Sequence, residues 1–224
     1  MLSLIFLAGG SGTRMGSPIP KQFLPLGGKP VALHSFDLFL SLSEISEIIV
    51  VCAPPYQHYF TSSTTPLRFA LPGLRRQDSV YHGLKACHPN SKLIMIHDAA
   101  RPFVEKKNIL DLICAADRTG AAALATPASS TIKICTPQKI VQQTLERSTL
   151  WQMQTPQALL PSILHQGFLQ TLQKNLEVTD DVSLAEAIDH PVEIVNGSPS
   201  NFKLTTPFDW LVAQTLISAS HGAL

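Results

Sequence analysis

Three short runs of apolar residues constrain the fold of this chain more than any other feature. They lie at residues 3–8 (SLIFLA), 47–53 (EIIVVCA) and 92–98 (KLIMIHD), each bounded by polar or turn residues. A strand that is apolar on both faces belongs to a buried, mostly parallel sheet, because helices cover both sides of such a sheet. Residues 67–73 and 121–128 are weaker strand candidates.

Helical patterns alternate with these strands. Apolar residues recur every three to four positions along several segments, which is the pattern of a helix with one buried face. The segments are residues 29–42, 75–87, 105–120, 155–173, 180–189 and a closing helix from about residue 206. The alternation of strands and helices predicts an α/β fold with a doubly wound, mostly parallel sheet and right-handed crossovers.

The composition excludes several classes of protein. Hydrophobic residues make up 45% of the 224 residues and charged residues 15%, which favours a well-buried core over disorder. The formal net charge is only +1, whereas a nucleic-acid binder normally carries a clear basic excess. No apolar run approaches the roughly 20 residues of a membrane span. We therefore expect neither a nucleic-acid partner nor a membrane.

The N-terminus and the cysteines predict a cytoplasmic protein. The opening MLSLIFLAGG has no positively charged region before its short apolar run, so we interpret it as a buried strand and not as a signal peptide. The four cysteines, Cys52, Cys87, Cys114 and Cys135, form no C-x-x-C pair and stand in apolar or helical contexts. We expect four buried free thiols in a reducing compartment rather than a zinc site or a set of disulfides.

Residues 129–147 break the rhythm of strands and helices. Their sequence, SSTIKICTPQKIVQQTLER, alternates apolar and polar residues around a TPQK turn, which predicts a β-hairpin projecting from the domain. The exposed edges of such a hairpin are often covered by a second subunit, so we expect a homodimer through this arm. Because no segment has the composition of a linker, residues 1–224 are predicted to be one domain that carries the arm.

A glycine-rich loop follows the first predicted strand and is the first chemical signal in the sequence. Four glycines, Arg14 and Lys21 lie within residues 9–21, GGSGTRMGSPIPK. A Walker A loop does not fit, since GGKP has proline where a hydroxyl is required. A dinucleotide fingerprint does not fit either, because the glycines are spaced G-x-G-x-x-x-G and no acidic residue follows the second strand. An NAD-linked oxidoreductase is therefore disfavoured.

Such a loop is suited to binding phosphates. Its backbone N–H groups can point at oxygens, while Arg14 offers a planar fork of donors and Lys21 a compact charge. Together they can follow a triphosphate and neutralise charge that builds up at one phosphorus. The alternative is an ordinary solvated loop.

The motif HDAARP places a carboxylate where ligands bind in this class of fold. Asp98 falls at the C-terminal end of a buried strand, and open α/β sheets hold their ligands at that end. The carboxylate can orient a ribose, hold a magnesium ion or pair with Arg101. A structural Asp–Arg turn is the alternative, and His97 is expected to be packed in the core.

Two further segments have both a structural and a functional interpretation. In GLRRQDSVYHG, Asp78 or Ser79 can cap a helix, or Ser79 can grip a base or a phosphate. In EVTDDVSLAEA, Ser183 and Glu186 match the capping-box spacing, which leaves residues 179–181 unexplained. Lys203, a lone cation in a strand-like stretch, taken alone is an ordinary surface charge.

Seven motifs follow one another in an order that identifies a family. They are the glycine loop, PKQF, RRQDSVYHGLKA, HDAARPF, TLERSTLWQMQTPQA, TDDVSLAEA and NFKLTTP. In this order the chain resembles the 2-C-methyl-D-erythritol 4-phosphate cytidylyltransferases over nearly its whole length. The resemblance implies a Rossmann-like domain, a β-arm exchanged between two subunits and a magnesium-dependent reaction. In that reaction CTP and methylerythritol phosphate give a CDP-linked product and pyrophosphate.

The resemblance also implies roles for individual residues. CTP-binding positions are Ala8, Gly9, Gly10, Gly12, Thr13, Gly73, Arg76, Ser79 and Asp98. Acceptor-binding positions are Asp98, Arg101, Thr131, Arg147, Thr179 and Lys203, with Thr131 and Arg147 supplied by the partner's arm. Catalytic positions are Arg14, Lys21, Arg147 and Lys203. Asp98 is the candidate protein ligand for Mg²⁺, which otherwise binds through the CTP phosphates.

One departure from the family pattern bears on the acceptor. The family loop is commonly A-A-G-x-G-x-R-M, whereas here Gly9 stands for the second alanine, and GSPIPKQFLPLGGKP is similar to the ribitol 5-phosphate cytidylyltransferases. The alternative acceptor is therefore ribitol 5-phosphate or a similar sugar or polyol phosphate. HDAARP and ERSTLWQMQTPQ favour methylerythritol phosphate. A nucleotide-binding module without turnover is the alternative from a different class.

Overall fold

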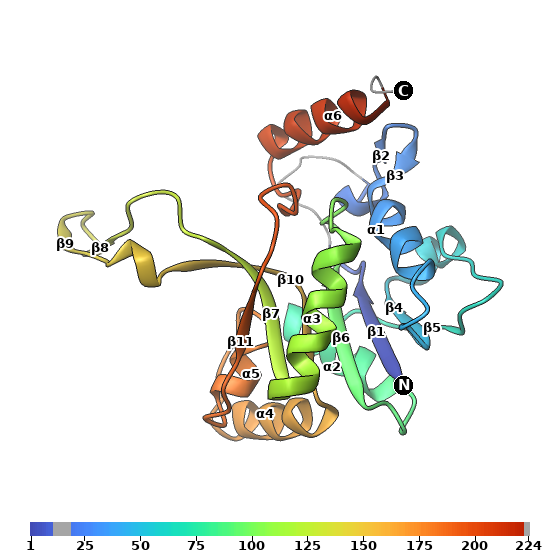
Figure 1. Ribbon diagram of the computed structural model, residues 1–224, viewed down its shortest axis with the longest axis horizontal. Coiled ribbons are helices and arrows are strands. Elements are labelled where there is room, and N and C mark those ends of the chain that lie inside the picture. Colours follow the sequence, from blue (N-terminus) through green and yellow to red (C-terminus); the bar gives the residue numbers. More distant parts are fainter. Residues whose placement is uncertain (11–18, 222–224) are drawn as a thin grey trace.

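The computed structural model describes residues 1–10 and 19–221, and its centre is a seven-stranded sheet (Figure 1). The strand order is β11-β7-β10-β6-β1-β4-β5, in which β10 runs antiparallel to both of its neighbours and the other pairs are parallel. The strands are β1 Leu2–Leu7, β4 Glu47–Val51, β5 Leu67–Ala70, β6 Leu93–Asp98, β7 Ala121–Pro127, β10 Trp151–Leu159 and β11 Glu193–Asn196. The predicted α/β fold with a mostly parallel sheet is confirmed.

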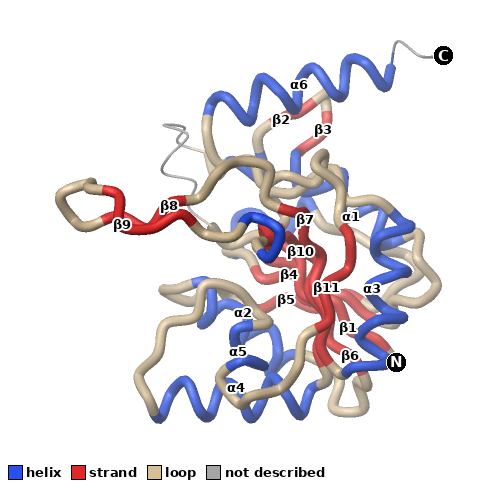
Figure 2. The backbone as a smooth tube through the Cα atoms, turned by 60° about the vertical axis from the view of Figure 1, so that its left-hand side comes forward, coloured by secondary structure: helices blue, strands red, loops and turns tan. Residues whose placement is uncertain are grey.

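Helices cover both faces of this sheet (Figure 2). They are α1 Val31–Leu40, α2 Arg76–Ala86, α3 Lys106–Thr119, α4 Pro161–Gln173 and α5 Ser183–Glu186. The last helix, α6 Pro207–His221, lies beyond the sheet, on a small apolar cluster that includes Leu26 and Val31 (Figure 1). Side chains of α1 and α3 pack in one hydrophobic core, and side chains of α2, α4 and α5 pack in a second core on the opposite face. Strand β1 shows the reason, since Leu4 and Phe6 point into the first core and Ile5 into the second.

The order of the strands reverses beside β1. The chain moves outward from β1 to β4 and β5, and then crosses back through α2 to β6 on the other side of β1. In a doubly wound sheet this switch point leaves a crevice at the C-terminal ends of the two central strands. Here those ends are Leu7 and Asp98, which are directly paired in the ladder between β1 and β6.

Two hairpins and three short 3-10 helices complete the described chain. The hairpins are β2 Pro25–Leu26 with β3 Lys29–Pro30, and β8 Lys133–Cys135 with β9 Val141–Thr144; the 3-10 helices are Lys21–Phe23, Pro54–Tyr59 and Arg147–Thr149. The β8–β9 hairpin lies within the predicted segment 129–147 and projects away from the sheet (Figure 1). None of the helices in the described part of the chain combines the length and the apolar character needed to cross a membrane.

The structure corrects several expectations about the C-terminal half. Residues 155–159, predicted to be helical, belong to β10, because pairing with β6 and β7 buries them in the sheet and outweighs the helical spacing. The helix predicted over residues 180–189 covers only Ser183–Glu186, since Asp189 adopts a left-handed φ of 56° just beyond it. No strand forms around Lys203 within the described residues 201–206.

Predictions about capping and about the cysteines are also corrected. The Ser183 backbone N–H and hydroxyl both donate to the Asp180 carboxylate, so the expected Ser183–Glu186 box does not form. Of the thiols expected to be buried, that of Cys52 is buried, that of Cys87 is half-buried, and those of Cys114 and Cys135 are exposed. Cys114 lies on the outer face of α3 and Cys135 in the projecting hairpin, where no core covers them.

Candidate active site

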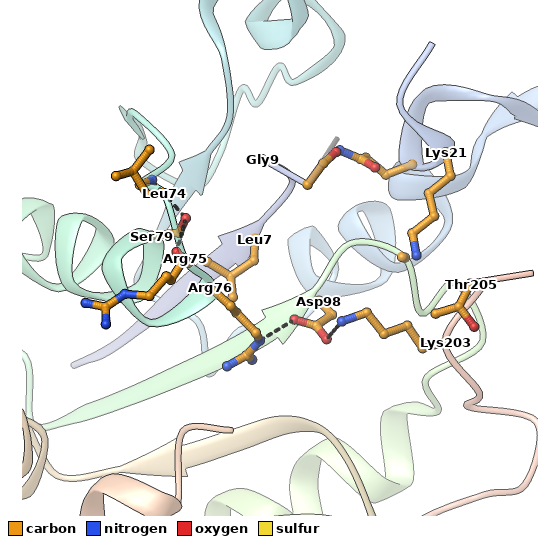
Figure 3. Close-up of a pocket in the computed structure, with 14 residues that line it drawn as sticks. Leu7, Gly9, Lys21, Leu74, Arg75, Arg76, Ser79, Asp98, Lys203 and Thr205 are labelled. Carbon is orange, nitrogen blue, oxygen red and sulfur yellow. Dashed lines mark hydrogen bonds and ion pairs between the residues drawn. The ribbon is translucent and has the colours of Figure 1, made fainter. Parts of the chain in front are cut away.

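A cavity of about 490 Å³ opens at the C-terminal ends of β1 and β6 (Figure 3). Eight of the residues predicted for the site line it: Gly9, Gly10, Lys21, Gly73, Arg76, Ser79, Asp98 and Lys203. Six further lining residues had no predicted site role: Leu7, Gln22, Leu74, Arg75, Ala100 and Thr205. Residues from five separate segments of the chain therefore meet at the crevice that the topology creates.

An alternating chain of charges begins on the floor of this cavity, with Lys203, Asp98 and Arg76, and continues to Asp181 outside its lining. Lys203 Nζ lies 2.7 Å from Asp98 Oδ2, and Arg76 Nε lies 3.1 Å from Asp98 Oδ1, so both oxygens of one carboxylate have a cationic partner (Figure 3). The two terminal nitrogens of Arg76 donate to Asp181 at 2.8 and 2.7 Å. The order is thus Lys203, Asp98, Arg76, Asp181.

These ion pairs set the protonation states of the buried groups. Burial by itself raises the pKa of the Asp98 carboxyl, but the charges of Arg76 and Lys203 outweigh it and hold this pKa well below its ordinary value. Burial likewise lowers the pKa of the Arg76 guanidinium, and the Asp181 and Asp98 carboxylates more than reverse that effect. Asp98 is therefore an ionised acceptor and Arg76 a cation throughout the physiological range.

Asp98 is also fixed through its backbone. Its N–H donates to the Thr155 hydroxyl at 3.0 Å, and that hydroxyl lies 3.2 Å from His97 Nδ1. His97 Nε2 lies 3.1 Å from the carbonyl oxygen of Arg101, which can only accept, so Nε2 carries the proton and Nδ1 accepts from Thr155. Burial lowers the pKa of His97 to about 3, which keeps the ring neutral. The expectation that His97 is packed in the core is confirmed.

Of the roles considered for the Asp98 carboxylate, a pairing with the Arg101 side chain is not formed among the described residues. The Arg101 guanidinium donates instead to the carbonyls of Asn201 at 2.7 Å and Met153 at 3.3 Å. Only its backbone N–H reaches Asp98, donating to the carbonyl oxygen at 2.9 Å as in a turn. The Asp98 carboxylate is paired instead with Lys203 and Arg76. Both residues come from segments outside the local motif HDAARP.

Gly9 lies close to the ring of Pro72, just after the end of β1. A Cβ atom on Gly9 would lie 2.5 Å from Cβ of Pro72, so even alanine would require a shift at this position. This contact gives a physical reason for the departure from the family pattern, in which alanine stands here. Gly10 lines the cavity, and a Cβ atom on it would meet no atom of the described residues within 4 Å.

Gln22 is a site residue that the sequence analysis missed. Its side chain is buried, and its Nε2 donates to the carbonyls of Ala8 at 2.7 Å and Gly10 at 2.8 Å. The bonds tie the beginning of the loop to the 3-10 helix that carries Lys21, whose amine points into the cavity (Figure 3). The motif PKQF drew attention to this position, but nothing local indicates that its side chain reaches back to residues 8 and 10.

The segment Gly73–Ser79 forms another wall. Ser79 Oγ accepts the N–H of Gly73 at 2.9 Å and donates to the carbonyl of Arg75 at 3.2 Å. The N-cap of α2 is Arg75, and Asp78, three residues further on, accepts the Arg75 N–H at 3.0 Å. The expectation that Asp78 or Ser79 is itself the N-cap is therefore wrong. Gly73 is required because a Cβ there would collide with Asp78.

Other predicted site residues lie away from the cavity or outside the described chain. Ala8 precedes the lining glycines, while Thr131, Arg147 and Thr179 have exposed side chains that do not line the cavity. Arg147 donates to the carbonyl of Ser129 at 3.2 Å, within its own arm. Residues 12–14, predicted to bind and activate the triphosphate, lie outside the described residues.

The donor set fits a magnesium ion held mainly by its substrate. Among the described residues no group of three His, Cys, Asp or Glu side chains is arranged to enclose a metal. Asp98 is a buried, ionised carboxylate that lines the cavity beside the glycine loop. Mg²⁺ characteristically binds through one or two carboxylates together with substrate phosphates, so one protein ligand is compatible with that mode.

Fold and site together define a class of protein. A glycine-rich sequence after the first strand and converging cations at the switch point of a doubly wound sheet characterise α/β proteins that bind nucleotides and other phosphates. The family model of 2-C-methyl-D-erythritol 4-phosphate cytidylyltransferase matches residues 2–219. The chain belongs to this family.

Relatives and solved structures agree with the family match. A rice protein named as the chloroplastic 2-C-methyl-D-erythritol 4-phosphate cytidylyltransferase is 46% identical over 97% of this chain and 74% of its own length. The Chlamydia pneumoniae enzyme of the same name is 44% identical over 96% of this chain and 98% of its own. The crystal structure of the Anaerococcus prevotii 4-diphosphocytidyl-2C-methyl-D-erythritol synthase has a TM-score of 0.86 at 30% identity, covering 97% and 98% of the two chains.

Proposed function

We propose that this protein transfers the cytidylyl group of CTP to 2-C-methyl-D-erythritol 4-phosphate. The products are 4-diphosphocytidyl-2-C-methyl-D-erythritol and pyrophosphate, in the biosynthesis of isoprenoid precursors. The observation that carries the proposal is the chain Lys203–Asp98–Arg76 on the floor of a cavity that is also lined by Gly9, Gly10 and Lys21. It combines an ionised carboxylate with several cations, and such cations reduce the repulsion between two anionic phosphates.

The reaction is an in-line displacement at the α-phosphorus of CTP. An oxygen of the acceptor phosphate forms a bond to this phosphorus while the bond to the β-phosphate oxygen breaks, and pyrophosphate leaves with that electron pair. No protein nucleophile is needed, because the attacking phosphate is already an anion. The amines of Lys21 and Lys203 lower the repulsion between the reactants and stabilise negative charge in the transition state. Arg14 stays a predicted contributor to the same task.

Magnesium is part of this proposal. When bound to the phosphates of CTP, Mg²⁺ neutralises charge and orients the triphosphate. Asp98 would hold it from the protein side, since its carboxylate stays ionised on the floor of the cavity and each oxygen has a further lone pair beside the one that accepts from Arg76 or Lys203. Arg101 and Thr179 stay predicted ligands of the acceptor. Thr179 lies two positions before Asp181 in the sequence.

A homodimer is a further part of the proposal. The arm is exposed along its length and carries apolar side chains, among them Ile140 and Val141 with 65% and 57% of their surface exposed. Thr131 and Arg147 belong to this arm and lie outside the cavity of their own subunit. We propose that each arm docks on the other subunit and brings these two residues to its acceptor site.

Free, exposed thiols at Cys114 and Cys135 favour a reducing compartment, and we propose the cytoplasm.

The identity of the acceptor is tested by pyrophosphate release. Purified protein is given CTP and Mg²⁺ with either methylerythritol 4-phosphate or ribitol 5-phosphate in parallel. We expect strong release with the former and little with the latter. The reverse result would move the protein to polyol-phosphate activation with the same catalytic residues. No release with either acceptor, from a folded sample that binds CTP, would favour a binding module.

A further inference from the structure

Asp181 is a buried carboxylate without an assigned role. Only 2% of its surface is exposed and it does not line the cavity, so it has no direct access to a substrate there. Its side chain accepts both terminal nitrogens of Arg76, at 2.8 and 2.7 Å, across 105 positions of sequence. A buried carboxylate with this bidentate geometry fixes the plane of the guanidinium it binds.

The sheet itself holds Asp181 in place. The backbone N–H groups of Asp181 and Val182 both donate to Gln157 Oε1, at 2.8 and 3.0 Å. Gln157 lies in β10, where it is 1% exposed and is paired with Ile96 of β6. The Asp181 carboxylate is therefore anchored to the strand next to the one that ends in Asp98.

The anchored carboxylate determines how Arg76 meets Asp98. Because Asp181 occupies both terminal nitrogens, Arg76 presents Nε to one oxygen of Asp98 at 3.1 Å. The other oxygen accepts from Lys203 Nζ at 2.7 Å. Without Asp181 the guanidinium is free to turn and bind Asp98 through two nitrogens, in competition with Lys203.

We propose that Asp181 is a positioning residue for cytidylyl transfer. It holds Arg76 in the orientation that leaves one Asp98 oxygen to Lys203. In this way it keeps the Asp98 carboxylate and the Lys203 amine in their relative positions in the cavity. This inference rests on the proposed function. A purely structural role is the rival explanation, in which Asp181 only anchors the segment between α4 and α5.

Two variants separate these explanations. In Asp181→Asn one carboxylate oxygen is replaced by an NH₂ group, which donates and faces a donor nitrogen of Arg76. We expect kcat to fall about 10- to 100-fold, as for other residues that orient a site through a partner. The KM for CTP should change less than about threefold. Asp180→Asn is the matched control, because Asp180 is adjacent in sequence but does not contact Arg76, and the asparagine keeps an oxygen that can accept from Gln157 of β10 and from Ser183. We expect this control to lower thermal stability and to keep kcat within about twofold.

A double-mutant cycle tests whether Asp181 acts through Arg76. Arg76→Lys removes the bridge, so adding Asp181→Asn to it should lower kcat by less than about twofold. Losses that multiply, a loss of equal size in Asp180→Asn, or an unchanged kcat in Asp181→Asn would each overturn the proposal. Melting curves and near-ultraviolet circular dichroism verify that every variant is folded. A wild-type protein that releases no pyrophosphate would instead refute the proposed function.

Discussion

Single amide and carboxylate groups organise this site at the scale of residues. Gln22 joins two stretches of the cavity wall with one NH₂ group, and Asp98 receives a cation on each of its oxygens. Each of these contacts satisfies a group that is buried, where an unpaired donor or acceptor is costly. Substitutions that keep the volume of the side chain and remove its polar atoms therefore test the contacts most cleanly.

Gln22→Met removes two donors while keeping a side chain of similar length. With the carbonyls of Ala8 and Gly10 released, the backbone of residues 8–10 is no longer held in place, at a cost of about 1 to 2 kcal/mol. We expect the affinity for CTP to fall about 5- to 30-fold, measured by titration calorimetry. Gln154→Met is the control, because Gln154 is also buried and also donates to a carbonyl, that of Ser198, away from the cavity. Equal affinities in the two variants would contradict the assigned role of Gln22.

Strand β6 couples stability to pH at the scale of elements. His97 lies in this strand, fully buried and stacked on Phe6 of β1 with ring centroids 5.9 Å apart. Its folded pKa of about 3 lies below the ordinary histidine value of about 6.5. The unfolded chain therefore binds a proton between these values that the folded chain does not, and acid favours unfolding.

The free energy of unfolding should fall as the pH is lowered from 7.5 to 5. His97 alone contributes about 2 kcal/mol to this decrease, because the stabilisation is present above pH 6.5 and is lost towards pH 3. We expect His97→Gln, which does not titrate, to show a decrease smaller by about that amount in urea unfolding measured at the two pH values. The same pH dependence in both proteins would show that His97 is not buried as a neutral ring.

The elements also show which parts of the fold the sequence allowed us to predict. Strands β1, β4 and β6 were predictable because each is apolar on both faces, a local property of five or six consecutive residues. Strand β10 was not, since residues 155–159 have helical spacing and only their pairing with two other strands makes them extended. Tertiary pairing outweighs local preference there.

The candidate site follows the same rule. Asp98 and the glycines were predictable from their place after apolar strands, where the topology puts ligands. The partners of Asp98 were not, because Lys203 lies 105 positions away and Arg76 lies 22 positions away. The contact between Asp181 and Arg76 likewise joins segments that have no shared local pattern.

At the scale of the whole molecule, the proposed exchange of the arm, residues 129–147, determines which subunit supplies each part of a site. If each site combines Lys203 of one subunit with Arg147 of the other, a variant lacking either residue is inactive by itself. Mixing Arg147→Ala with Lys203→Met and allowing subunits to exchange creates heterodimers with one intact site. We expect about a quarter of wild-type activity to return at equal concentrations, since half the dimers are mixed and each has one working site.

Size-exclusion chromatography with light scattering verifies that mixed dimers form. An equal mixture of Lys203→Met with Lys21→Met serves as the control, because both substitutions damage the same subunit's half of the site. In the heterodimer of this mixture, each of the two sites contains one of the two substitutions. We therefore expect no return of activity. Recovery in the control, or its absence with Arg147→Ala in verified heterodimers, would contradict the exchange of arms.

Formation of the CDP-linked product by wild type and by Lys203→Met is the measurement that tests the central claim most directly. Phosphorus NMR follows the product with saturating CTP, Mg²⁺ and methylerythritol 4-phosphate. We expect the wild type to turn over and the variant to be about 100- to 1000-fold slower, as for loss of one donor to a developing charge. A variant within twofold of the wild type would show that cytidylyl transfer does not occur in the cavity above Asp98.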